Sequence, residues 1–171
     1  MQLSKNLFKI PFLLNGKMCY SYRAQKIFLI VMSLPPQKFR EILFQLLYSQ
    51  DFTSLEPLES IPFMMQELKV TRRTMVDAHL KIEKICEKLE LIDELIKTFS
   101  KNYSLDRISN VEKTILRLGI YELLYDENLP YKIIISEAVR LCRKFGTRES
   151  ANFVNAILDA IYQHSNQSAT V

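Results

Sequence analysis

The stretch RISNVEKTILRLGIYELLY, residues 107–125, decides the fold of this chain. It opens with Ser109-Asn110-Val111-Glu112, a capping box in which the serine hydroxyl accepts the third amide and the glutamate reaches back. Apolar side chains then cover nearly every side of the predicted helix, which is typical of a helix at the centre of a bundle. Arg117 and Glu122 interrupt this apolar surface. An unpaired buried ion is very costly, so we expect both residues to form structural ion pairs, with a carboxylate partner for Arg117 that the sequence does not identify.

The rest of the composition indicates an all-α protein. The 171 residues suit one domain, with 48% hydrophobic and 25% charged residues, an ordinary globular balance. There are 3 Gly and 6 Pro, and neither type occurs from Phe63 to Leu118. Helices exclude both residues from their interiors, whereas sheets need frequent turns. Helical patterns are predicted over 38–50, 63–70, from 71 to a break at 101–106, and over 109–125, 131–146 and 149–163.

The charge is unevenly distributed along the chain. Residues 1–31 contain no acid and carry all the excess positive charge, at Lys5, Lys9, Lys17, Arg23 and Lys26. The remaining residues carry 18 basic and 19 acidic side chains, a net charge of −1. A global electrostatic argument for nucleic-acid binding therefore fails, and RNA binding would have to rest on local patches.

Residues 1–31 form a leader of different composition from the rest. The apolar run at 27–32 is too short to span a bilayer, which takes roughly 20 residues. The leader is a real appendage, a weak secretory signal, or upstream sequence translated in error; the abrupt change in composition favours the third, with Met32 as the start. We expect a domain over 32–165 and a frayed tail over 166–171.

The residues that usually carry chemistry are dispersed. Cys19, Cys86 and Cys142 lie far apart with no CxxC pair, and His79 and His164 have no ligand-like neighbours, so no metal site or disulfide framework is expected. Neither a glycine-rich phosphate loop nor a nucleophile–base pattern occurs. We therefore predict no enzyme activity and no cofactor. This cysteine usage suits the reducing cytoplasm.

Three segments of the chain resemble a known family. DRISNVEKTILRLGIYELLY, LPYKIIISEAVRLCRKFG and ESANFVNAILDAI, spanning 106–161 without a large gap, resemble the C-terminal half of the NusB family of bacterial transcription antitermination factors. KFREILFQLLYSQ at 38–50 resembles the family's first helix, with Tyr48 at its tyrosine. Residues 51–105 match only as a helical pattern, and 1–31 match nothing.

The resemblance implies a NusB-like bundle of about seven helices in two subdomains. It also implies binding of boxA RNA together with NusE, a small-subunit ribosomal protein, in a complex that helps RNA polymerase pass terminators, chiefly in ribosomal RNA operons. No catalysis and no membrane association are implied. Some family members pair through the surface that otherwise receives partners, so a homodimer remains open.

The resemblance also assigns candidate site residues. Tyr48 and Glu112 align with the NusE interface. The RNA contacts that it implies are Lys38, Arg40, Glu149, Ser150, Asn152 and Phe153. The predicted RNA surface also includes Lys144 and Arg148, which, with Arg143, can supply part of the positive charge from the turn near 146. Phe153 either stacks on a base or belongs to the core.

Two features of these residues depart from the family pattern. The lead-in SLPPQKFR at 33–40 is much less basic than the arginine-rich family lead-in, and Asn152 stands where the family often has lysine. Each lost phosphate contact lowers affinity for RNA. A protein-only helical scaffold, which binds NusE or another partner with RNA binding lost, is therefore the alternative.

Overall fold

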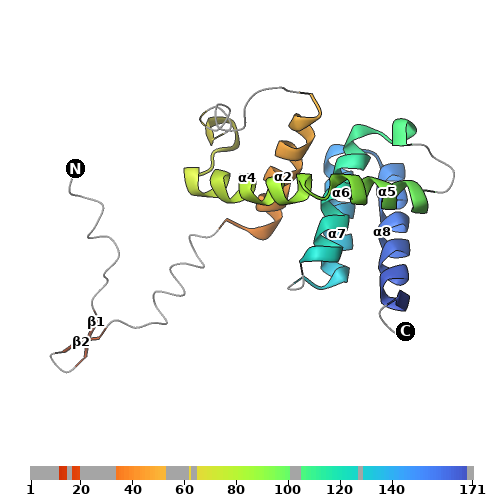
Figure 1. Cartoon of the computed structure of the whole chain (residues 1–171). Helices are drawn as coiled ribbons and strands as arrows, with labels where there is room; N and C mark the ends of the chain where they lie inside the picture. The colour runs from red at the N-terminus through yellow and green to blue at the C-terminus, as the bar shows by residue number, and fades with distance from the viewer. Residues whose placement is uncertain are drawn as a thin grey trace. The chain divides into compact units, whose positions relative to one another are not determined.

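The computed structural model consists of two units, Met1–Pro35 and Pro36–Val171, shown in Figure 1. The residues that it describes are 12–14, 17–19, 34–52, 62, 65–100, 105–126 and 129–168.

The first unit contains a small β-hairpin. Strand β1 (Phe12–Leu14) pairs antiparallel with β2 (Lys17–Cys19), and Leu13 lies opposite Met18. The sequence analysis predicted no strand in the leader, so the expectation of an all-α chain does not extend to this unit. The apolar run at 27–32, which includes the predicted start residue, lies outside the described residues.

The second unit is helical throughout its described part, as predicted. Its long helices are α2 (Pro36–Gln50), α4 (Arg72–Cys86), α5 (Leu89–Phe99), α6 (Asn110–Tyr125), α7 (Tyr131–Phe145) and α8 (Arg148–Ser168). A 3-10 turn, η1 (Leu105–Arg107), precedes α6, and 65–68 are helical within the predicted short helix at 63–70. Residues 53–61, between the predicted helices at 38–50 and 63–70, and most of the break at 101–106 lie outside the described residues.

The long helical pattern that begins after Thr71 is two helices. The chain turns at Glu87–Lys88, where Glu87 N–H donates to Glu83 and Lys88 N–H donates to Ile85, each at 3.0 Å. The second bond spans three residues, so the helix tightens and changes direction before α5 begins. Neither Gly nor Pro marks this turn, and the apolar spacing continues across it, which is why the sequence did not reveal the break.

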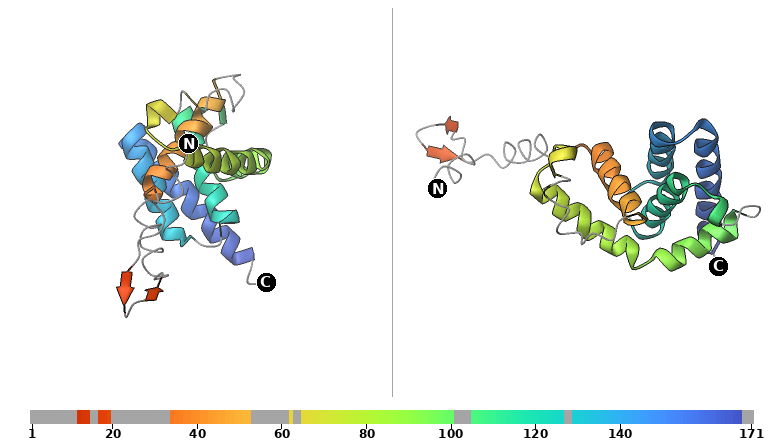
Figure 2. Two further views of the ribbon diagram at one scale, coloured as in Figure 1. Left: turned by 90° about the vertical axis from the view of Figure 1, so that its left-hand side faces the viewer. Right: turned by 90° about the horizontal axis from the view of Figure 1, so that it is seen from above.

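Helix α6 is the centre of the bundle. It packs against α2, α4, α5, α7 and α8. Ile115, Leu116 and Ile120 are almost completely buried, as the apolar pattern predicted. Gly119 allows α8 to approach closely, because a Cβ there would lie 3.0 Å from Leu158 Cδ1. Helices α7 and α8 lie side by side next to it (Figure 2), while α2 packs on both α4 and α6.

The helix ends follow their local signals. Ser109 Oγ accepts the Glu112 amide at 3.3 Å, and Glu112 Oε2 accepts the Ser109 amide at 3.1 Å, which is the predicted capping box. Gly146 ends α7, as predicted. Helix α8 continues to Ser168, beyond Gln163, where its pattern was expected to stop, so the predicted tail from 166 is helical at its beginning. Within the described residues, we find no helix with the length and apolar character needed to cross a membrane.

Candidate RNA and protein interface

Arg40, one of the predicted RNA contacts, lies in the interior. It is 6% exposed, and its Nε donates to both carboxylate oxygens of Glu122, at 3.1 and 3.0 Å. Lys81 Nζ lies 3.7 Å from the same carboxylate. Burial and this ion pair leave the guanidinium unavailable to a phosphate in the folded protein. The prediction for Arg40 is therefore corrected: its role is to join α2 to α6, and it supplies the partner of Glu122.

Arg117 has two carboxylate partners. Its Nε and Nη2 donate to the two oxygens of Asp93, at 2.9 and 2.7 Å. Its Nη1 donates to Asp51 at 3.3 Å. The hydrogen bonds that Arg117 donates to Asp93 are the main cause of the raised pKa of Arg117. This bidentate geometry, which only arginine can make, ties α5 and the turn after α2 to the middle of α6.

The two candidate partner residues lie around the end of α7. The Tyr48 ring stacks on Phe44 with centroids 5.8 Å apart, and Phe44 stacks on Phe145 at 4.6 Å. Cys142 lies one turn before Phe145 on α7. Burial raises the pKa of its thiol to about 12, and the negative charge of Glu112 contributes to this rise. The structure thus brings Tyr48 and Glu112 to the same end of the bundle from different helices.

Phe52 belongs to this region and was missed from the sequence. It lies two residues after the end of α2, is 59% exposed, and its ring centroid lies 5.0 Å from that of Tyr48. An aromatic residue four positions after Tyr48 was the available signal. Helical spacing did not identify it, because the helix ends at Gln50.

Two of the predicted RNA residues, Arg148 and Asn152, line a hollow of about 480 Å³ at the turn between α7 and α8. Its lining consists of Arg143, Gly146, Thr147, Arg148, Ala151 and Asn152. Among the residues that the structure describes, neither Arg143 nor Arg148 has an ion-pair partner. The hollow also lies at the N-terminal end of α8, where the helix dipole favours anions. Arg143 was considered in the sequence only as a source of extra charge, and the structure places it in the lining.

Ser150 and Glu149, in the first turn of α8, form local hydrogen bonds. Ser150 is 6% exposed, and its amide donates to the Thr147 hydroxyl at 3.1 Å, so it takes part in the helix cap, and its RNA contact stays a prediction. Glu149 is exposed, and hydrogen bonds from its own backbone amide and from Thr147 lower its pKa. Its negative charge, next in the chain to Arg148 of the lining, opposes a phosphate there. Phe153, on the next turn of α8, is half-buried.

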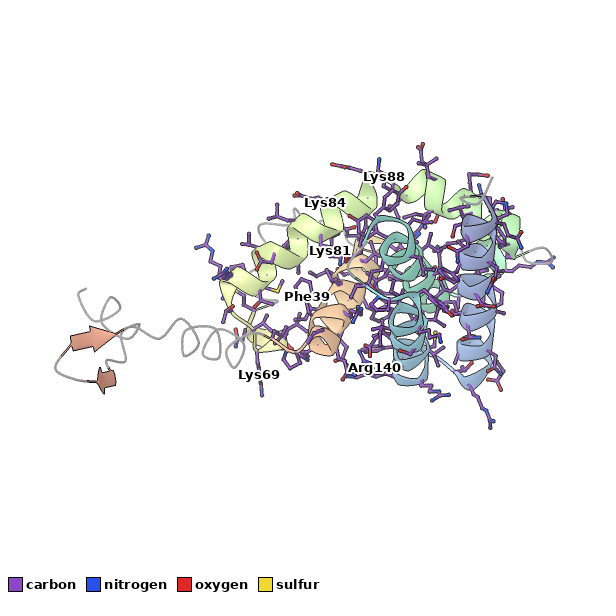
Figure 3. The ribbon with its side chains drawn as sticks, turned by 90° about the horizontal axis from the view of Figure 1, so that it is seen from below. Phe39, Lys69, Lys81, Lys84, Lys88 and Arg140 are labelled. Carbon is purple, nitrogen blue, oxygen red and sulfur yellow. The ribbon has the colours of Figure 1, made fainter. Side chains whose placement is uncertain are left out.

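The predicted RNA lysines Lys38 and Lys144 meet at one carboxylate. Lys144 Nζ lies 2.7 Å and Lys38 Nζ 3.9 Å from Glu41 Oε2. Arg140, on α7 (Figure 3), donates to Glu41 Oε1 at 2.6 Å. Burial alone would raise the pKa of Glu41, but the hydrogen bonds from Lys144 and Arg140 outweigh it and lower the pKa. Lys144 on α7 and Lys38 on α2 are thus held at the same carboxylate, and Lys144 is next in the chain to Arg143 of the hollow.

Known proteins resemble this chain over most of its length. The NusB family model matches residues 37–163. The transcription antitermination protein NusB of Clostridium perfringens is 36% identical over 129 residues, which cover 74% of this chain and 96% of that protein. The NusB protein of Thermotoga maritima is 35% identical over 130 residues, which cover 76% of this chain and 92% of that protein.

Solved structures agree with this result. A structure of T. maritima NusB has a TM-score of 0.67 and 34% identity, covering 77% of this chain and 93% of that chain. A crystal structure of the antitermination factors NusB and NusE in complex with double-stranded RNA has a TM-score of 0.65 and 26% identity. The match covers 75% of this chain and 96% of that chain.

Proposed function

This chain belongs to the NusB family, and on that basis we propose that it is a transcription antitermination factor that binds boxA RNA together with NusE. In this role it helps RNA polymerase read through terminators, chiefly in ribosomal RNA operons. It acts by binding and not by catalysis, and it acts in the cytoplasm, where the transcript is made.

The hollow at the α7–α8 turn carries the RNA part of the proposal. Arg143 and Arg148 line it without a competing carboxylate partner in the described structure. Lys144 and Lys38 extend the positive surface along α7 and α2. Phosphate contacts from such residues position single-stranded RNA, and the half-exposed ring of Phe153 offers a surface for base stacking.

The NusE part of the proposal rests on a negatively charged side chain, whereas the RNA part rests on positively charged ones. Tyr48 and Glu112, around the end of α7, present an aromatic ring and a carboxylate. Such a surface suits a basic protein and repels a phosphate backbone. The solved complex of a related NusB with NusE and RNA supports assigning both kinds of partner to one chain of this fold.

A protein-only scaffold is the second candidate. Residues 32–171 carry a net charge of −1, Lys144 is engaged by Glu41, and Glu149 adds a negative charge at the hollow. These features favour weak RNA binding by this chain alone.

Labelled boxA RNA separates the two functions. We expect the full chain and NusE together to bind the RNA much more tightly than either protein alone, measured by fluorescence anisotropy. The double variant Arg143→Ala/Arg148→Ala should weaken this binding at least about tenfold, because each lost cation removes a phosphate contact. Arg72→Ala/Arg73→Ala removes two exposed arginines from the start of α4 and is the matched control. Binding of NusE without any binding of RNA would favour the scaffold.

A further inference from the structure

Glu41 is a buried carboxylate that pairs with two of the predicted RNA lysines. The residue is 8% exposed, whereas the side chains of Lys144 and Lys38 are 49% and 43% exposed. Glu41 Oε2 lies 2.7 Å from Lys144 Nζ and 3.9 Å from Lys38 Nζ. Solvent therefore reaches both lysines, while the negative charge that they share stays inside the protein.

The carboxylate of Glu41 is fixed, and the lysines are the parts that can move. Glu41 Oε1 accepts a hydrogen bond from Arg140 Nη1 at 2.6 Å. Arg140 is itself held on α7, because its Nε donates to Glu137 at 2.9 Å and its Nη2 donates to the Gln37 carbonyl at 3.1 Å. A lysine ammonium group, in contrast, is a point charge on a flexible four-carbon stem. A phosphate that approaches this surface can therefore draw a lysine away from Glu41, but Glu41 cannot follow.

Carboxylate and phosphate compete for the same donor groups. An ammonium group donates to either kind of oxygen, so RNA that contacts Lys144 must weaken or replace the 2.7 Å contact with Glu41. Burial would raise the pKa of Glu41, but hydrogen bonds from Lys144 and Arg140 lower it. The ionised carboxylate is thus stabilised by the same lysine that a phosphate would recruit, and RNA binding through Lys144 has to offset the loss of this contact.

The opposite effect, in which Glu41 holds the lysines ready for RNA, is the weaker one. Holding a side chain in place saves part of the rotamer entropy that binding costs. At 3.9 Å, Lys38 is beyond hydrogen-bond distance of Glu41, so this saving applies to Lys144 alone. The negative charge, by contrast, weakens the attraction of phosphate to both lysines. The sum of the two effects therefore favours competition.

We propose that Glu41 is an internal competitor of RNA phosphate, which lowers the affinity of this chain for RNA by pairing with Lys144 and Lys38. Phosphate contacts carry no sequence information, so the effect applies to RNA of any sequence. Tight binding then depends on contacts made elsewhere, at the hollow and by NusE. This inference rests on the proposed function, since it takes RNA as the ligand of this surface.

Fluorescence anisotropy of the full chain with labelled boxA RNA, and with a scrambled RNA of equal length, tests the proposal. Glu41→Gln should bind both RNAs about fivefold more tightly, the size expected when one partly exposed ion pair no longer has to be given up. Glu137→Gln is the matched control. Glu137 is also 8% exposed and pairs with Arg140 of the same network, so the RNA affinity of this variant should stay close to that of the unmodified chain. All affinities are measured well below the melting temperature of each variant.

A double-mutant cycle identifies the lysine through which Glu41 acts. Lys144→Ala should cost more RNA affinity in the Glu41→Gln chain than in the unmodified chain, because without the carboxylate Lys144 gives up no partner when it contacts phosphate. A general effect of Glu41 on folding or on net charge would give equal costs in the two backgrounds. Equal costs would therefore overturn the proposal.

The unmodified chain provides a measurement that does not depend on how the variants fold. The NMR signals of the Lys144 ammonium group should shift when RNA is added, as phosphate replaces the carboxylate partner. Unchanged Lys144 signals would overturn the proposal, and so would a Glu41→Gln chain that binds RNA no more tightly than Glu137→Gln. Weaker binding by Glu41→Gln would show that Glu41 positions the lysines for RNA, and would also overturn it. In each of these cases, boxA binding by the unmodified chain with NusE leaves the proposed function intact, whereas absence of that binding refutes the proposed function itself.

Discussion

Arg40 and Glu122 lie 82 positions apart in the sequence, and Arg40 Nε donates to both carboxylate oxygens of Glu122 within the core. Both residues are less than a tenth exposed. The pair joins α2 to α6 where the two helices cross. Any other alignment of these apolar surfaces would leave a buried charge without its partner, so the pair favours one packing arrangement.

Removing the cation of this pair should destabilise the fold. We expect Arg40→Met to lower the free energy of unfolding by about 3–5 kcal/mol, because Glu122 is left as a buried charge, with only Lys81 at 3.7 Å to compensate. Urea denaturation gives this value. Arg40→Met/Glu122→Met should recover much of the loss, since no buried charge remains. A single variant as stable as the unmodified chain would show that Lys81 is sufficient.

The bidentate geometry at Arg117 should matter more than its charge. Arg117→Lys keeps the charge but cannot bond both oxygens of Asp93, so we expect a loss of about 1.5–3 kcal/mol in the free energy of unfolding. Asp93→Asn should cost more than Asp51→Asn, because Asp93 accepts the two shorter bonds. Equal losses in the two asparagine variants would contradict the unequal roles assigned to these carboxylates.

Glu41 should make the stability depend on pH in the acid range. Its pKa in the folded protein is below the ordinary 4.5, so the unfolded chain binds more protons there than the folded one. The stabilisation is present above pH 4.5 and is lost as the pH falls through the folded pKa. Denaturation across this range should show a steeper loss for the unmodified chain than for Glu41→Gln. Parallel curves would mean that Lys144 and Arg140 do not stabilise the carboxylate.

The salt dependence of RNA binding should be proportional to the number of side-chain cations that contact phosphates. Arg40 is buried and is therefore excluded, whereas Arg143 lines the hollow and is included. The four candidate cations are Lys38, Arg143, Lys144 and Arg148. For this chain alone, the slope of log K against log salt should be about −3, at roughly −0.7 per contact to single-stranded RNA. Arg143→Ala should make the slope shallower by about 0.7. An unchanged slope would remove Arg143 from the RNA surface.

Phe153 is half-buried, so its truncation should have two separable effects. Phe153→Ala should weaken boxA binding in the presence of NusE by about 1–3 kcal/mol if the exposed part of the ring stacks on a base. Its cost in stability should be below the roughly 3–5 kcal/mol of a fully buried phenylalanine. RNA affinity and thermal unfolding are measured on the same sample. A variant that melts normally and binds RNA as tightly as the unmodified chain would favour the protein-only scaffold.

The start of α6, its central position and the end of α7 could be predicted from the sequence because their causes are local. The capping box at Ser109 and Glu112, the glycine at 146 and the period of the apolar residues act within a few positions of where they stand. The family resemblance also depends on these short patterns. The turn at Glu87–Lys88 could not be predicted, since it interrupts neither the apolar spacing nor the helix-forming composition.

The tertiary structure alone decided which charged residues are available to partners. Arg40 and Lys38 are two residues apart on one helix, yet Arg40 is paired in the core and Lys38 reaches the surface. Arg117 finds Asp93 and Asp51 at separations of 24 and 66 residues. Such pairs form where separate helices cross, and the crossing follows from the packing of the whole bundle, which short-range sequence patterns do not encode. The exposure of Phe52 also depends on tertiary packing. Phe44 of α2 packs on Phe145 of α7, whereas Phe52, in the turn after α2, contacts Tyr48 and stays exposed.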